Sequence, residues 1–163
     1  MKESEKEKST VEVHTRSLNL IREIRVDLTL ESLETLKKFP VKALLDSGAT
    51  DNFIDQKLVD KYNLDEIKLE KPIPVFQSDG KKNSAGDLTG FVDLRMKFQD
   101  HAEQTRFFVT TLGSHDVFLG HTWLQKHNPE INWETGEVEM SRCPKKTCGH
   151  VHRSKRSERQ HIK

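Results

Sequence analysis

The chain has 163 residues, 27 Lys and Arg against 26 Asp and Glu, and a hydrophobic content of 33%. This length predicts one domain, and no window approaches the roughly 20 consecutive apolar residues of a membrane helix. The charged start (MKESEKEKST) lacks the apolar stretch of a secretory signal, and two cysteines are too few for a disulfide framework. We therefore expect no membrane span and a cytoplasmic location, with a nuclear one left open.

Composition divides the chain into three parts. Residues 1–16 alternate Lys and Glu with few apolar side chains, and we expect them to be disordered. Residues 142–163 hold eight basic residues and one acid, a charge of +7 that leaves −6 on the rest of the chain. We interpret them as a flexible basic tail. Residues 17–141 carry most of the apolar positions and are predicted to form a single domain.

The predicted elements of this domain are short strands with two short helices. In chain order, strands are expected at residues 24–30, 41–45, 72–76, 88–98, 106–111 and 117–120, helices at 55–63 and 122–127, and a final hairpin at 131–140. Many short strands joined by polar turns predict an all-β, barrel-like fold. Trp123 and Trp133 are both expected in its core.

Asp46-Ser47-Gly48 is the strongest local signal. Asp-Ser-Gly alone is a common turn sequence, but here it directly follows an apolar strand. A polar, Gly-rich hairpin at residues 77–87 follows it, and the apolar run Phe118-Leu119-Gly120 leads into the second helix. This context favours a functional carboxylate over an ordinary surface turn.

The ordered set of motifs resembles the retropepsins, the aspartic proteases of retroviruses and long-terminal-repeat retrotransposons, and especially the gypsy-type retrotransposon proteases. Residues 44–54 (LLDSGATDNFI) are similar to the active-site strand and turn of that family. Residues 72–90 are similar to its flap hairpin, and residues 116–132 to its late strand and helix. The resemblance implies a closed acid-protease β-barrel that needs no cofactor.

The resemblance also implies roles for individual residues. Asp46 would be catalytic, with Ser47 and Gly48 supporting the active-site turn. The substrate would lie against Gly48, Ala49, Thr50 and Asp51. The flap residues would be Ser78, Asp79, Gly80, Ala85 and Gly86, where glycines suit a lid that must bend.

A homodimer follows from the chemistry of peptide hydrolysis. Two carboxylates are needed at one water, and the sequence holds a single Asp-Ser-Gly. Asp46 is therefore expected to meet Asp46 of a second copy across a two-fold axis, where two close carboxylates share one proton and activate the water. The predicted function is an aspartic endopeptidase acting on an extended polypeptide, by resemblance a retrotransposon polyprotein. One alternative is a catalytically silent dimerisation or peptide-binding module.

A second alternative is a domesticated fragment whose basic tail contacts nucleic acid. Neutralisation of phosphates would make such contact weak and non-specific, and the tail has no aromatic residue to stack on bases. A solvated terminus is the simpler interpretation.

Metal-ligand residue types also occur in the tail, as Cys143, Cys148, His150 and His152. Their spacing fits none of the usual zinc motifs, so we expect free thiols and no metal. The remaining scattered histidines are expected to be ordinary core or surface residues. They are His101, His115, His121 and His127.

Overall fold

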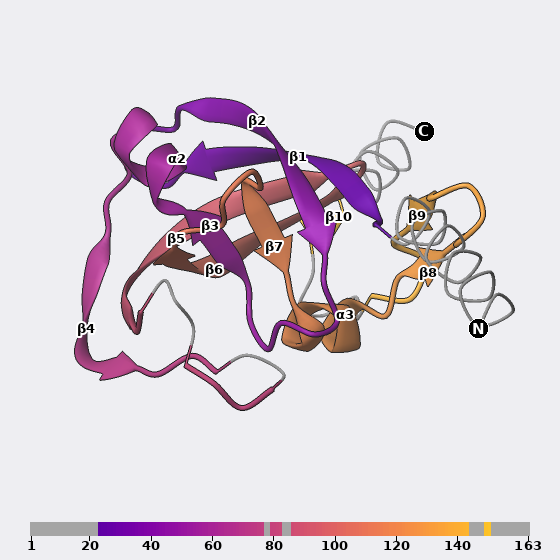
Figure 1. Ribbon diagram of the computed structural model, residues 1–163. Coiled ribbons are helices and arrows are strands. Elements are labelled where there is room, and N and C mark those ends of the chain that lie inside the picture. Colours follow the sequence, from indigo (N-terminus) through magenta and orange to yellow (C-terminus); the bar gives the residue numbers. More distant parts are fainter. Residues whose placement is uncertain (1–22, 77–78, 83–85, 144–148, 151–163) are drawn as a thin grey trace, which may run out of the picture.

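The computed structural model describes residues 23–76, 79–82, 86–143 and 149–150. A barrel dominates these ranges, with a long arm on one side and a small hairpin on the other (Figure 1). No helix in the described part of the chain is long and apolar enough to cross a membrane.

Six strands form the barrel. They are β1 (Arg25–Ser32), β2 (Lys38–Leu45), β3 (Phe53–Asp55), β5 (Leu88–Phe98), β6 (His101–Thr110) and β7 (Val117–Leu119). Their order is β6-β3-β7-β2-β1-β5, and the ring closes because β5 also pairs with β6. The β2–β7 and β3–β6 pairs are parallel, whereas the other neighbours are antiparallel. The predicted all-β barrel is confirmed.

Alternating side chains fill this barrel. Val26, Leu28 and Leu30 of β1 are buried between exposed or half-buried neighbours, because successive strand residues point to opposite faces. The same alternation along β5 buries Leu94 and Met96. The period of two in the sequence therefore identified the core-facing side of both strands.

The remaining elements decorate the barrel. They are α2 (Gln56–Lys61), β4 (Ile67–Ile73), α3 (His121–His127), β8 (Glu130–Ile131), β9 (Val138–Glu139) and β10 (Gly149–His150). The strand β4 pairs with the start of β5 and forms the arm at the left of Figure 1, which continues into a loop below the barrel. Both predicted helices and the final hairpin are thus confirmed.

The two tryptophans differ in their surroundings. Trp123 on α3 is 4% exposed, as predicted, but Trp133 is 62% exposed. The prediction for Trp133 was wrong because its hairpin, β8–β9, has only two residues in each strand and offers no second layer to cover an indole.

The ordered chain continues past the predicted domain boundary at residue 141. Arg142 donates hydrogen bonds to the carbonyl oxygens of Asn128 at 2.8 Å and Pro129 at 3.0 Å. Cys143 is buried, and β10 pairs with the start of β6. These contacts place the beginning of the predicted tail on the domain. The predicted disordered segment 1–16 and residues 151–163 lie outside the described residues.

Candidate active site

Asp46 begins the turn that follows β2. Its amide donates to the carbonyl oxygen of Leu119 on β7 at 2.9 Å, which continues the parallel pairing of β2 with β7. Its Oδ1 accepts the Gly48 amide at 3.0 Å, and its carbonyl accepts the Ala49 amide at 3.1 Å. The carboxylate is therefore held by its own turn. Asp46 itself is half-buried, whereas Ser47 and Gly48 are exposed.

The start of α3 supports this turn from below. The amide of His121 donates to the carbonyl of Ala49 at 2.7 Å, and the amide of Thr122 donates to that of Thr50 at 3.1 Å. These first helical amides have no partner within their own helix. They instead fix the backbone that follows Asp46, so α3 and the turn form one unit.

Gly120 and Asn52 complete the support. The amide of Gly120 donates to Asn52 Oδ1 at 3.0 Å. A Cβ at Gly120 would overlap the carbonyl oxygen of Asp51 and come within 2.8 Å of that of Ala49. A glycine is therefore required for the close approach of the two segments. The sequence identified the apolar run that ends in Gly120, but no pattern indicated a role for Asn52.

A cavity of about 330 Å³ opens beside this turn. Asp46, Gly48, Ala49 and Thr50 form one wall. The other lining residues are mostly apolar and include Val75 and Phe76, which follow the arm, and Leu88 at the start of β5. The carboxylate thus faces a space large enough for part of a peptide.

Not every predicted site residue borders the cavity. Asp51 is turned towards α3, where its Oδ1 accepts the Thr122 hydroxyl at 3.4 Å. In the described part of the flap, Gly80 and Gly86 have φ of +83° and +87° and open space around them. They shape the loop but, with Asp79, do not border the cavity. Ser78 and Ala85 lie outside the described residues.

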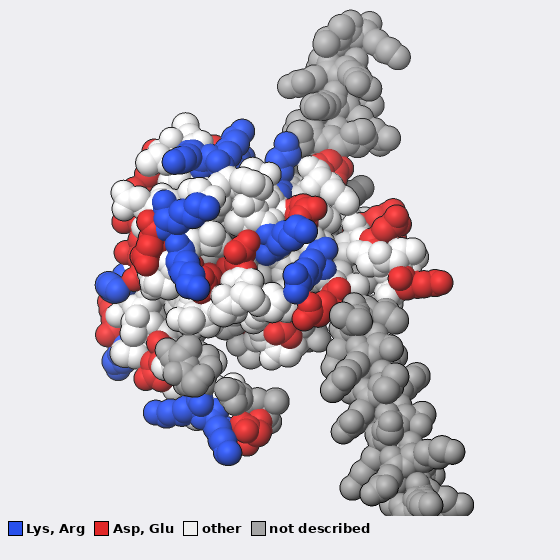
Figure 2. Space-filling model, turned by 45° about the horizontal axis from the view of Figure 1, so that its top comes forward, with Lys and Arg blue, Asp and Glu red and all other residues white. Residues whose placement is uncertain are grey.

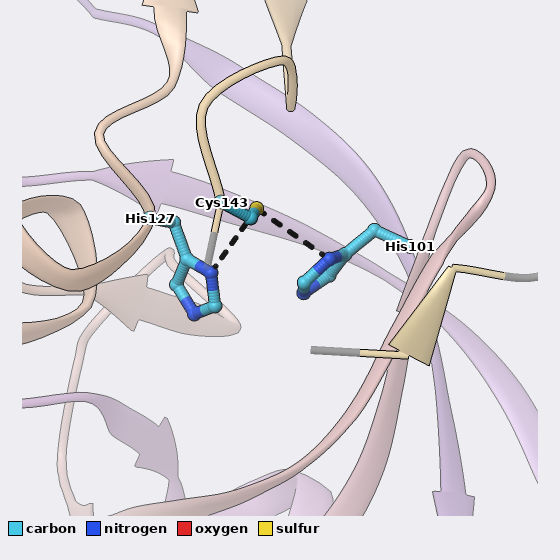
Figure 3. Close-up of side chains that lie close together, drawn as sticks. All are labelled: His101, His127 and Cys143. Carbon is cyan, nitrogen blue, oxygen red and sulfur yellow. Dashed lines mark hydrogen bonds between the residues drawn. The ribbon is translucent and has the colours of Figure 1, made fainter. Parts of the chain in front are cut away.

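A second cluster of polar side chains is buried inside the domain. His101 at the start of β6 and His127 at the end of α3 are both 0% exposed, and Cys143 is 8% exposed. The Cys143 sulfur lies between the two rings, 3.4 Å from His127 Nδ1 and 3.7 Å from His101 Nδ1 (Figure 3). The interpretation of Cys143 as part of a solvated tail is therefore wrong, because its side chain is buried.

Glu103 connects the other sides of the two rings. Its Oε2 lies 2.9 Å from His101 Nε2 and 2.8 Å from His127 Nε2. Its Oε1 accepts hydrogen bonds from Thr105 Oγ1 at 2.7 Å and Trp123 Nε1 at 3.0 Å. Burial favours the protonated carboxyl, but the hydrogen bonds from His101, His127 and Thr105 outweigh it and hold the pKa of Glu103 well below its usual range.

The sequence held no spacing motif for this cluster, because its members come from three separate segments. The four tail residues considered as zinc ligands are not brought together as a group by the described residues. Of these four side chains the structure describes that of Cys143, which lies in the buried cluster. His150 contributes backbone to β10, and Cys148 and His152 lie outside the described residues.

The surface of the domain carries both charge signs. Lys and Arg are interspersed with Asp and Glu on the face shown in Figure 2. This face has no broad basic patch of the kind that binds nucleic acid. Contact with nucleic acid stays a prediction about the tail.

Residues 42–148 match the model of a family described as the PEG10/RTL1 protease domain. Three solved structures also match over much of this chain. The retroviral protease-like domain of Ddi1 from Leishmania major is 15% identical, with a TM-score of 0.42, over 66% of this chain and 78% of that chain. The EIAV protease in complex with the inhibitor HBY-793 is 17% identical, with a TM-score of 0.44, over 70% of this chain and 96% of that chain. Lpg0085 from Legionella pneumophila, a protein with unknown function, is 16% identical, with a TM-score of 0.36, over 63% of this chain and 85% of that chain.

Proposed function

The chain belongs to the PEG10/RTL1 protease domain family, and from this we propose that it is an aspartic endopeptidase, active as a homodimer on extended polypeptides. Its retropepsin-like domain supplies the scaffold. The observation that carries the proposal is the position of Asp46, half-buried on a hydrogen-bonded turn at the edge of a cavity. The natural substrate we infer from the sequence resemblance is a retrotransposon polyprotein.

The proposed reaction needs two carboxylates. One Asp46, ionised, would take a proton from a water molecule, while the protonated Asp46 of the second copy would donate to the scissile carbonyl. Because the sequence has one Asp-Ser-Gly, the second carboxylate must come from another chain. The exposure of Ser47 and Gly48 in the single chain supports this arrangement, since the turn is open to a partner.

The cavity indicates how a substrate would bind. The turn presents backbone at Gly48 and Ala49, and Val75 and Phe76, which follow the arm, line the same cavity. An extended peptide placed between them would gain strand-like hydrogen bonds and would bury its side chains in pockets. Phe53, Leu88 and Phe118 also border the space. We therefore expect apolar side chains next to the scissile bond.

Replacement of the carboxylate tests this proposal. Asp46→Asn keeps the shape of the side chain and an oxygen for the Gly48 amide, so the fold should persist while cleavage is lost. Asp27→Asn is the matched control, because Asp27 is exposed on β1, away from the cavity. Both variants and the unaltered chain would be incubated with a peptide library at mildly acidic pH, and the products identified by mass spectrometry.

The outcomes separate the enzyme from a silent module. Cleavage by the unaltered chain and by Asp27→Asn, but not by Asp46→Asn, supports the proposal. Cleavage that persists in Asp46→Asn contradicts it. Peptide binding without cleavage at any pH would favour the dimerisation or peptide-binding module instead.

A further inference from the structure

Three potential metal ligands converge in the buried cluster of His101, His127 and Cys143. One ligand atom from each lies within 4.8 Å of the other two. The two imidazole rings are almost perpendicular, with an interplanar angle of 82° and 4.9 Å between centroids. They therefore approach the sulfur from different directions, as Figure 3 shows, and do not stack on each other.

The carboxylate of Glu103 determines which ring nitrogens face the sulfur. An ionised carboxylate only accepts hydrogen bonds, so the Nε2 atom of His101 donates to it at 2.9 Å. The Nε2 atom of His127 lies 2.8 Å from the same oxygen in an ion-pair contact, and it too carries its proton there, since a lone pair would face the lone pairs of the carboxylate. In a neutral imidazole the Nδ1 atom then carries a lone pair, and both Nδ1 atoms face Cys143. A carboxylate behind a histidine is the usual arrangement around metal-bound imidazoles.

We propose that His101, His127 and Cys143 bind a zinc ion through Nδ1, Nδ1 and Sγ, with a water molecule completing the tetrahedral coordination and Glu103 as the positioning residue behind both rings. A divalent cation held by the thiolate accepts both imidazole lone pairs together. This mixed sulfur and nitrogen set is typical of zinc.

The distances agree with this assignment. Zinc bonds of ordinary length at a tetrahedral angle place a sulfur and a nitrogen ligand about 3.6 Å apart. The two sulfur–nitrogen distances here are 3.4 and 3.7 Å. Because all three ligand atoms lie within 4.8 Å of one another, small side-chain movements would bring each to bonding distance of one cation between them.

The proposed ion would join three segments that are distant in sequence. His101 begins β6, His127 ends α3, and Cys143 lies in the segment before β10. The same helix supports the Asp46 turn with its first amides. The site would thus hold α3 against the barrel, a role independent of whether the chain cleaves peptides.

Metal analysis of the full chain, purified without an affinity tag, tests the proposal. We expect one zinc per chain by plasma mass spectrometry. Replacement of zinc by cobalt should give the intense visible bands of a tetrahedral site and a thiolate-to-cobalt charge-transfer band. Metal-free protein should gain several degrees in melting temperature when zinc is added, since the ion binds the folded state preferentially.

Variants assign the site to these residues. His101→Gln and His127→Gln should lose the stoichiometric metal, and Cys143→Ser should lose the charge-transfer band. His115→Gln is the matched control, because His115 contacts Phe118 away from the cluster, and it should keep both. Metal that survives in the first three variants would belong elsewhere in the chain and would overturn the proposal.

The unaltered chain gives an answer even if those variants do not fold. Absence of zinc after purification, together with no cobalt spectrum and no thermal shift on adding zinc, would overturn the proposal. The cluster would then be a hydrogen-bonded core. An X-ray absorption spectrum with oxygen ligands only would overturn it as well.

Discussion

Gly120 and Asp51 meet where two segments of the site come closest. The missing side chain lets the carbonyl oxygens of Asp51 and Ala49 approach the Gly120 backbone, and its amide reaches Asn52. A single Cβ would have to displace backbone atoms, which cannot move aside as the end of a flexible side chain can. Gly120 therefore determines how closely α3 lies beneath the Asp46 turn.

Gly120→Ala should destabilise the fold by about 3 kcal/mol, because overpacking against rigid backbone is costly. It should also reduce cleavage by displacing the turn. Urea unfolding monitored by tryptophan fluorescence measures the first effect, and the peptide assay measures the second.

Gly136→Ala is the control for this substitution. Gly136 has φ of +80° but open space around it, so only conformational strain of about 1–2 kcal/mol is expected, with cleavage unchanged. Equal losses of stability and of cleavage in both variants would refute the close-packing argument.

At the scale of elements, Asp55 connects β3, α2 and the loop after β6. It stands at the N-cap of α2 but makes no side-chain cap hydrogen bond there. Its Oδ1 instead accepts the Leu112 amide at 2.9 Å, and its amide donates to the Asp116 carbonyl at 2.9 Å. This loop also borders the cavity through Thr111 and Leu112. A residue placed like a helix cap therefore positions a wall of the site.

Asp55→Ala should lower the free energy of unfolding by about 1–3 kcal/mol, since it leaves the Leu112 amide without its acceptor. Asp55→Asn keeps an oxygen in that place and should cost less. Asp60→Ala on the exposed side of α2 is the control, expected to stay within about 0.5 kcal/mol of the unaltered chain. Chemical denaturation measures all three, and an equal effect of Ala and Asn at position 55 would contradict the assignment.

The same elements show what the sequence could predict. The alternation along β1 and β5 and the order of the Asp46, flap and Gly120 motifs are local patterns. Such patterns predicted the turn and five of the six barrel strands, but not β3. Contacts between residues distant in sequence produce no local pattern and could not be predicted. Asp55 looks like a helix cap until the loop after β6 is placed beside it. Cys143 lies in a polar segment, and no spacing connects it with Glu103.

The predicted start of the strand at residues 41–45 was wrong, because strand pairing at that point could not be seen in the sequence. Pro40 was expected to precede its strand, yet β2 runs through it from Lys38. Proline lacks an amide donor and is tolerated in strands mainly where a partner is missing. Here β7 pairs only with Ala43, Leu44 and Leu45, so β2 has a single neighbouring strand, β1, at Pro40.

At the scale of the whole molecule, one chain would supply only half of the proposed active site. The turn that holds Asp46 lies at the surface of the chain, and a two-fold axis is the symmetry that pairs it with itself. Activity should therefore follow the concentration of dimer. Specific activity should fall on dilution, in contrast with an enzyme that is complete in one chain.

Mixing chains tests this directly. An excess of Asp46→Asn should inhibit the unaltered chain, because mixed dimers hold one catalytic carboxylate. A tenfold excess should reduce cleavage to about a tenth if the chains exchange freely. The same excess of active Asp27→Asn should raise total cleavage. Unchanged cleavage with excess Asp46→Asn, once exchange is verified by mass spectrometry, would rule out a shared site.

The support of the Asp46 turn by a distant part of the sequence also has a consequence for biosynthesis. The contact between Asn52 and Gly120 spans 68 positions, and non-local contacts of this kind form late in folding. On the ribosome, the loop carrying Asp46 cannot acquire its native support until Gly120 and the following helix have left the exit tunnel. If the chain is the proposed endopeptidase, a growing polypeptide that contains it should therefore not cleave itself before Gly120 and α3 have been synthesised.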